Sequence, residues 1–103
     1  MKLAGLDLSM TETGAAWTAD PAAPGECWAE TSVIRPRLVR DRRLPEIRRR
    51  VLEVVKGADF VLIEKLPPHL KSAGITGMVH GVLREALLQS SIPYGDVHPR
   101  TLK

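Results

Sequence analysis

The apolar run at residues 60–66, with the sequence FVLIEKL, constrains the fold of this chain more than any other segment. A continuous run of this length suits a strand that is buried on both faces at the centre of a sheet. Pro67 and Pro68 follow it, and proline cannot donate to a sheet ladder, so the strand ends there. Since 103 residues leave room for one domain, we expect a single layered α/β fold around this strand.

The other segments alternate between strand patterns and helix patterns. Strands are expected at residues 2–8, 14–19, 27–34 and 92–97. Apolar residues recur at three- and four-residue spacing from Leu44 and again from about Gly74, which predicts two amphipathic helices. Asp41 is placed to cap the first helix and Gly57 to end it. The predicted order is β-β-β-α-β-α-β, in which a front hairpin is followed by helices that cross over between parallel strands.

Glycines are dense at the start of the second helix, at Gly74, Gly77 and Gly81. Each costs roughly 1 kcal/mol relative to alanine in a helix interior. We therefore expect another element or a ligand to approach this helix closely. The apolar residues beside them, Met78 included, are expected in the core or in a dimer interface.

Two crossover helices in this order are most easily placed on one face of the sheet. The opposite face would then need a third helix, and the chain ends at Lys103, where that helix should begin. We therefore expect residues 1–103 to form a single domain that is truncated at its C-terminus.

Positive charge is concentrated in residues 35–50, where eight arginines stand against Asp41 and Glu46, a local charge of +6. The rest of the chain holds seven basic and ten acidic residues. A dense arginine block attracts polyanions, because each phosphate that it neutralises releases counterions. The alternative is a solvated helix face. The arginines of the first helix are expected to form a second basic surface, less well aimed at the acids described next.

Two acids, Asp7 and Glu64, each follow an apolar run near the end of a predicted strand. If the first and fourth strands are neighbours, the two side chains converge at the carboxyl ends of parallel strands. At ~4 Å and an effective dielectric near 20 they would repel by about 4 kcal/mol, which favours protonation or a shared cation. Two hard oxygen ligands suit Mg²⁺ or Mn²⁺ better than zinc or copper. Alternatively, Asp7 caps the turn that follows it, and Glu64 pairs with Lys65 or an arginine.

Other kinds of site are poorly supported. Cys27 alone cannot form an internal disulfide, and His69, His80 and His98 do not have zinc-ligand spacing. We interpret Asp96 and His98 as a solvated strand end. No apolar run approaches the ~20 residues of a membrane span, and the N-terminus lacks the apolar stretch of a secretory signal, so we expect a cytoplasmic protein without membrane contact.

Residues 5–9 (GLDLS), followed by Thr13 and Gly14, resemble the opening motif G-x-D-x-(G/S)-x-x-x-T-G of RuvC-like Holliday junction resolvases, in particular the phage-encoded members. Residues 61–64 are similar to the second, acid-bearing strand of that family. The similarity continues through residues 74–81 and 98–103, so it spans nearly the whole chain.

The resemblance implies an RNase H-like fold, with a mixed five-stranded sheet, that lacks its final helix. It also implies a homodimeric, Mg²⁺-dependent endonuclease, able to use Mn²⁺, that nicks four-way DNA junctions in a bacterial cell or a phage-infected host. Asp7 and Glu64 would then be catalytic metal ligands. The basic residues that follow the fourth and fifth strands are candidate phosphate contacts: Lys65, His69, Lys71, Arg100 and Lys103.

Three alternatives remain open. A DNA-binding module of the same fold with an incomplete site fits the missing helix, and a YqgF-like RNA-processing nuclease shares the fold and the opening motif. Half of an actin-like or sugar-kinase ATPase also has this opening, but such proteins need two domains, for which 103 residues leave no space.

Overall fold

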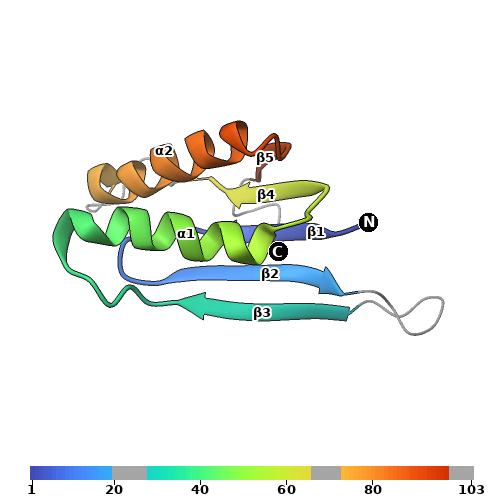
Figure 1. The fold of residues 1–103 in the computed structure, drawn as a ribbon, viewed down its shortest axis with the longest axis horizontal. Helices are drawn as coiled ribbons and strands as arrows, with labels where there is room; N and C mark the ends of the chain where they lie inside the picture. Colours follow the sequence, from blue (N-terminus) through green and yellow to red (C-terminus); the bar gives the residue numbers. More distant parts are fainter. Residues whose placement is uncertain (20–27, 66–72, 98–103) are drawn as a thin grey trace.

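The computed structural model describes residues 1–19, 28–65 and 73–97, and they form a five-stranded sheet with two helices (Figure 1). The elements in chain order are β1 (Leu3–Asp7), β2 (Thr13–Ala19), β3 (Trp28–Ile34), the short 3-10 turn η1 (Arg40–Arg42), α1 (Arg43–Val55), β4 (Phe60–Glu64), α2 (Ala73–Gln89) and β5 (Tyr94–Val97). The predicted order β-β-β-α-β-α-β is confirmed.

The sheet has the strand order β3-β2-β1-β4-β5. β2 pairs antiparallel with both β1 and β3, whereas β4 pairs parallel with both β1 and β5. Four strands therefore run in one direction and β2 runs in the other. Figure 1 shows the opposite arrows of β2 and β3. The carboxyl ends of β1, β3, β4 and β5 consequently meet at one edge of the sheet, which we call the carboxyl edge.

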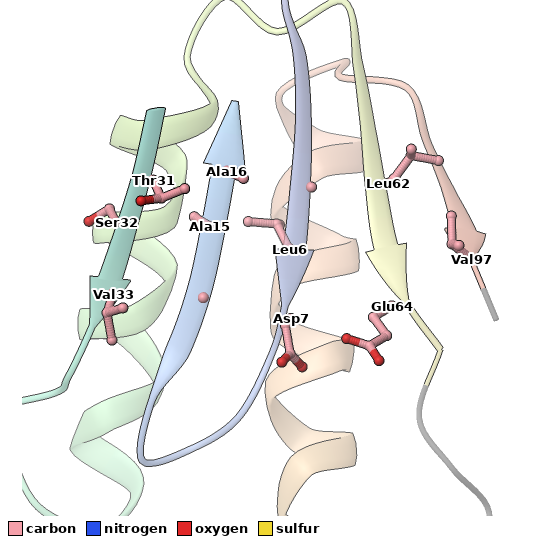
Figure 2. A pocket seen from close by; sticks show the side chains of 12 residues that line it. Leu6, Asp7, Ala15, Ala16, Thr31, Ser32, Val33, Leu62, Glu64 and Val97 are labelled. Carbon is pink, nitrogen blue, oxygen red and sulfur yellow. The ribbon is translucent and has the colours of Figure 1, made fainter. Parts of the chain in front are cut away.

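Both helices cover the same face of the sheet, and they lie behind it in Figure 2. The buried side chains of β1 and β4 are Ala4, Leu6, Val61 and Ile63, which alternate with residues on the opposite, open face. Leu62 is on the open face and is 40% exposed. The prediction that this strand is buried on both faces is therefore wrong, because α1 and α2 pack on one side only.

The start of α1 differs from the sequence prediction, whereas its end agrees with it. Asp41 lies inside η1, and α1 begins after Arg42 without a side-chain hydrogen bond as a cap, so the prediction that Asp41 caps the helix is wrong. The end of the helix is marked by Gly57, whose φ of +80° is a left-handed conformation that glycine adopts without strain.

Glu46 fixes the connection between β3 and α1. The residue is only 8% exposed, and its carboxylate accepts hydrogen bonds from the amides of Arg37 and Leu38, each at 2.9 Å. Arg50 donates to Glu46 at 3.1 Å and to the carbonyl oxygen of Arg35 at 2.9 Å. One buried carboxylate thus holds the backbone of the segment that enters α1.

The glycines of α2 do not mark a close contact within the described part of the chain. A Cβ atom added at Gly74, Gly77 or Gly81 would meet none of the described atoms within 4 Å. Ile75 and Met78, on the same helix, are 51% and 43% exposed. The tight contact that the sequence predicts is absent among these residues, and this part of α2 presents an open surface instead.

Neither α1 nor α2, the helices found in residues 1–19, 28–65 and 73–97, is long and apolar enough to cross a membrane.

The pKa of Glu46 predicts an acid-sensitive contribution to stability. The amide hydrogen bonds from Leu38 and Arg37 lower the pKa of Glu46 below its ordinary value of 4.5, against the opposing effect of burial. A lowered folded-state pKa stabilises the fold above pH 4.5 and ceases to do so as pH falls through the lowered value. Glu46→Gln is therefore expected to be less stable than the parent at pH 7, with a difference that shrinks below pH 4.5.

Urea unfolding followed by circular dichroism at pH 7, 4.5 and 3 measures this difference. The control is Glu53→Gln, which breaks only the exposed pair with Arg49 and is expected to cost about 0.3–0.5 kcal/mol. If the two variants lose the same stability at pH 7, Glu46 does not hold the connection.

Candidate active site

Two carboxyl groups lie side by side at the carboxyl edge of the sheet. In the parallel pairing of β1 with β4, Leu6 is in register with Ile63, and Asp7 and Glu64 are the next residues along each strand. Figure 2 shows both side chains at the same end of the sheet, with the Glu64 carboxyl directed toward Asp7. The predicted convergence of the two acids is confirmed, whereas their role as metal ligands remains a prediction.

The electrostatics of the pair agree with this geometry. The pKa of Glu64 is raised above its ordinary value of 4.5, first by burial, then by the negative charge of Asp7, and then by a hydrogen bond between the two carboxyl groups. Asp7 is exposed and Glu64 is half-buried, so the pair opens to solvent. Two acids in this arrangement are stabilised by a shared proton or a shared cation.

Ser9 and Thr13 close the turn that follows Asp7. The Ser9 hydroxyl accepts hydrogen bonds from the amides of Thr11 and Glu12, at 3.2 and 3.1 Å. Thr13, which is fully buried, donates its hydroxyl hydrogen to the Ser9 carbonyl oxygen at 2.9 Å. The capping that the sequence left open for Asp7 is thus provided by Ser9.

The alternative of an ion pair for Glu64 is not supported. The ion pairs among the described residues join Arg35 to Glu12, Arg49 to Glu53, Arg50 to Glu46 and Arg84 to Asp96. Within that part of the chain, the charged group that acts on Glu64 is another carboxylate.

The acids lie at one end of a hollow on the open face of the sheet (Figure 2). The hollow has a volume of about 400 Å³, and Gly5, Gly14 and Ala16 contribute to its lining. These residues have little or no side chain, so the sheet is not filled there. Val33 and Leu62 also line it. A substrate or another element can therefore approach the backbone of β1 and β2 beside the carboxyl groups.

One of the five predicted phosphate contacts falls on described residues. Lys65 is exposed directly after Glu64, and its amide donates to the Val97 carbonyl oxygen at 2.7 Å, which continues the pairing of β4 with β5. The other four lie outside the described residues: His69, Lys71, Arg100 and Lys103.

Asp96 does not belong to this site. It is in register with Ile63, on the face that the helices cover, and it forms an ion pair with Arg84 of α2. The interpretation of Asp96 as a solvated strand end is thus only partly correct, since a helix residue neutralises it. His98 lies outside the described residues.

His80 is a buried histidine of α2, and its spacing in the sequence was weighed only for zinc binding. It is 7% exposed on α2, and its pKa is lowered, first by burial and then by the positive charge of Arg84, while Asp96 and Asp7 act in the opposite direction. In the sequence, its place next to Val79 in the apolar stripe of α2 indicates that this histidine is buried.

The donor set determines which metal the pair suits. In residues 1–19, 28–65 and 73–97, no third histidine, cysteine or acid joins Asp7 and Glu64 in a cluster that could hold a metal. Mg²⁺ usually keeps several waters and is bound by one or two carboxylates together with substrate phosphates. Two open carboxylates therefore fit Mg²⁺ shared with a phosphate, rather than a closed cage of protein ligands.

Comparison with known proteins identifies the fold. No protein-family model matches the sequence, and no curated protein matches it. Among solved structures, RuvC of Thermus thermophilus is 24% identical with a TM-score of 0.77, and the match covers 96% of this chain and 64% of that one. The same protein in complex with a Holliday junction substrate gives 23% identity and a TM-score of 0.78, with the same coverage of both chains.

A Holliday junction resolvase of fowlpox virus is also similar, at 11% identity and a TM-score of 0.64, over 96% of this chain and 62% of that one. The chain thus spans somewhat under two thirds of the structures that it matches. These likenesses show that the described elements form an RNase H-like sheet of the RuvC type.

Removing one charge of the pair is expected to stabilise the fold at neutral pH. A carboxyl whose folded-state pKa is raised loses stability as pH rises from 4.5 through the raised value. Asp7→Asn removes the repulsion, so its melting temperature should exceed that of the parent at pH 7 in the absence of metal and equal it at pH 3.5.

Calorimetry in EDTA measures these temperatures, and carbon-13 NMR titration follows the Glu64 carboxyl, whose pKa should fall in Asp7→Asn. Glu85→Gln, an exposed acid of α2, is the control and should change neither quantity. An unchanged Glu64 titration in Asp7→Asn would show that the two groups do not interact.

Proposed function

We propose that this protein is a metal-dependent endonuclease that cleaves four-way DNA junctions by phosphodiester hydrolysis. The single observation that carries the proposal is the pair of interacting carboxyl groups of Asp7 and Glu64 at the carboxyl edge of a RuvC-type sheet. Two of the similar structures are described as Holliday junction resolvases or as bound to that junction, which supports the choice of substrate.

In this proposal Asp7 and Glu64 hold Mg²⁺, with Mn²⁺ as a substitute, together with a phosphate of the substrate. Such a cation would supply positive charge next to the phosphate and Lewis-acid chemistry for the hydrolysis. Asp7 is held by the β1 ladder and Glu64 by the β4 ladder, so the sheet fixes their separation before substrate arrives. Lys65, exposed beyond Glu64, binds a neighbouring phosphate of the same strand.

The symmetric cleavage of a junction requires two active sites, and we propose a homodimer that uses the outer face of α2. Ile75 and Met78 are half-exposed there, and the nearby glycines have open space around them among the described residues. Glycines in a helix destabilise it unless another backbone packs closely against them. A second copy of α2 would provide that contact.

One observation favours a second function, a DNA-binding module that does not cleave. The described residues provide two carboxylates, and no third ligand joins them there. Such a module would bind a junction and leave it intact in the presence of Mg²⁺.

Incubation of the purified chain with a labelled synthetic four-way junction and Mg²⁺ tests the proposal. Asp7→Asn and Glu64→Gln should each slow cleavage on the order of 10³-fold or more, because a bound metal contributes several kcal/mol to transition-state stabilisation. Both should lose Mn²⁺ binding by calorimetry while remaining folded, and Glu85→Gln should retain both activities.

The outcomes separate the candidate functions. Binding without cleavage by the parent chain supports the non-cleaving module, and faster cleavage of RNA supports the RNA-processing nuclease. Unchanged Mn²⁺ affinity in Asp7→Asn would falsify the metal site.

Light scattering tests the dimer. Met78→Lys places a charge on the proposed interface and should convert a dimer to a monomer at micromolar concentration. Leu88→Lys, at a 67% exposed position near the other end of α2, is the matched control and should leave the mass unchanged. A monomeric parent, or a dimer that both variants preserve, contradicts this interface.

A further inference from the structure

The arginine-rich connection between β3 and α1 begins at the same edge of the sheet as the two acids. Asp7 is in register with Gly14 of β2, and Gly14 is in register with Val33 of β3. Figure 2 shows Val33 at the end of β3 that lies on the side of Asp7 and Glu64. Only the arginines of the first helix were expected to form a less well aimed basic surface, and antiparallel pairing through β2 brings the end of β3, and so the connection before that helix, to the carboxyl edge.

We call residues 35–43, with the sequence RPRLVRDRR, the arginine arm. It holds five arginines and one aspartate. The side chains of Arg37, Arg40 and Arg42 are exposed, and none of them forms an ion pair with a carboxylate in the described part of the chain. Leu38 and Val39 between them are also exposed, at 49% and 70%. The arm thus presents unneutralised positive charge together with apolar surface.

The arm is anchored at its base rather than loose. The carboxylate of Glu46 accepts hydrogen bonds from two backbone amides of the arm and forms an ion pair with Arg50. This carboxylate is almost completely buried. Burying a carboxylate is unfavourable unless hydrogen bonds compensate for the lost water. Here the compensation fixes the backbone from which Arg37 projects, and a fixed backbone lowers the entropy lost when a ligand binds.

The middle of the arm has a strained backbone. Arg40 has a φ of +54°, a left-handed conformation that is unfavourable for a residue with a Cβ atom. Its own carbonyl oxygen accepts a hydrogen bond from Arg43 Nε at 3.0 Å, which contributes to this shape. Strain of this kind is concentrated at functional sites.

We infer that the arginine arm is a docking surface for the phosphate backbone of double-stranded DNA, on the β3 side of the carboxyl pair. This inference rests on the proposed function, since it assumes that the DNA being cleaved reaches Asp7 and Glu64. A duplex carries one negative charge per ~1.7 Å of its axis, so a segment with several free arginines can contact successive phosphates. The exposed Leu38 and Val39 pack against the sugars between those phosphates.

The test measures binding of a fluorescent four-way junction by anisotropy, in EDTA, between 50 and 200 mM salt. Each phosphate contact contributes about 0.9 to the slope of log affinity against log salt. Arg37→Ala with Arg40→Ala should therefore reduce that slope by roughly 2 and weaken binding on the order of tenfold or more.

The matched control removes the same number of charges elsewhere. The double variant Arg49→Ala with Lys56→Ala removes one exposed cation within α1 and one directly after its C-terminal end, outside the arm. It should leave the slope of log affinity against log salt nearly unchanged. Equal slopes for the two double variants overturn the inference. The inference is also overturned if the double variant of the arm binds the junction like the parent but binds an acidic protein or an anionic vesicle more weakly. The arm would then serve another partner.

Glu46→Gln tests the anchoring separately, since it retains every arginine. It should weaken junction binding while the salt slope stays near that of the parent, provided that circular dichroism shows the variant to be folded at the assay temperature. A folded Glu46→Gln that binds as tightly as the parent contradicts a preorganised arm.

Cleavage with Mg²⁺ distinguishes this inference from the proposed function. If the arm variants weaken binding and the parent does not cleave, the arm stands and the nuclease proposal fails. If the parent cleaves but the arm variants match the control, the nuclease proposal stands and the arm fails. A parent chain that does not bind the junction at 50 mM salt contradicts the arm as well.

Discussion

The parallel pairing of β1 with β4 is the interaction on which the site depends. Adjacent strands lie about 4.8 Å apart, and with Leu6 opposite Ile63 the next residue of each strand is an acid on the same face. Backbone hydrogen bonds of the sheet, rather than contacts of the carboxyl groups, hold these like charges together. A slip of one residue would turn one acid toward the helices and separate the pair.

The packed core of the fold holds the two acids together against their mutual repulsion. Val61 and Ile63 are fully buried beneath α1 and α2, and they hold β4 in place while the residues between them face outward. The raised pKa of Glu64 reflects the cost that this arrangement imposes. Positioning of acids that would avoid one another in solution is the physical property that we associate with cation binding.

The sequence was informative wherever a local pattern decides the result. The strand at residues 60–64 is specified by its apolar run, the end of α1 by Gly57, and the nearness of Asp7 to Glu64 by the general rule for crossover connections. These features depend on few residues at a time.

Features that depend on tertiary arrangement were not predictable in this way. Asp41 does not cap α1, and Glu46, further along the chain, binds the entering backbone instead. The aim of the arginine arm follows from the direction of β3, which becomes known only once β2 is paired on both sides. The close contact that the sequence predicts at Gly77 is absent among the described residues, which leave open space around it.

The one-sided packing of the helices has a consequence for how this protein can change over evolutionary time. In β1 and β4 the residues that stabilise the fold and the residues that face the hollow alternate along the same strands. Substitutions at Gly5 or Leu62 alter the surface next to the acids without touching the packed interior. The surface of the hollow can therefore change by single substitutions while the buried residues that alternate with it stay the same.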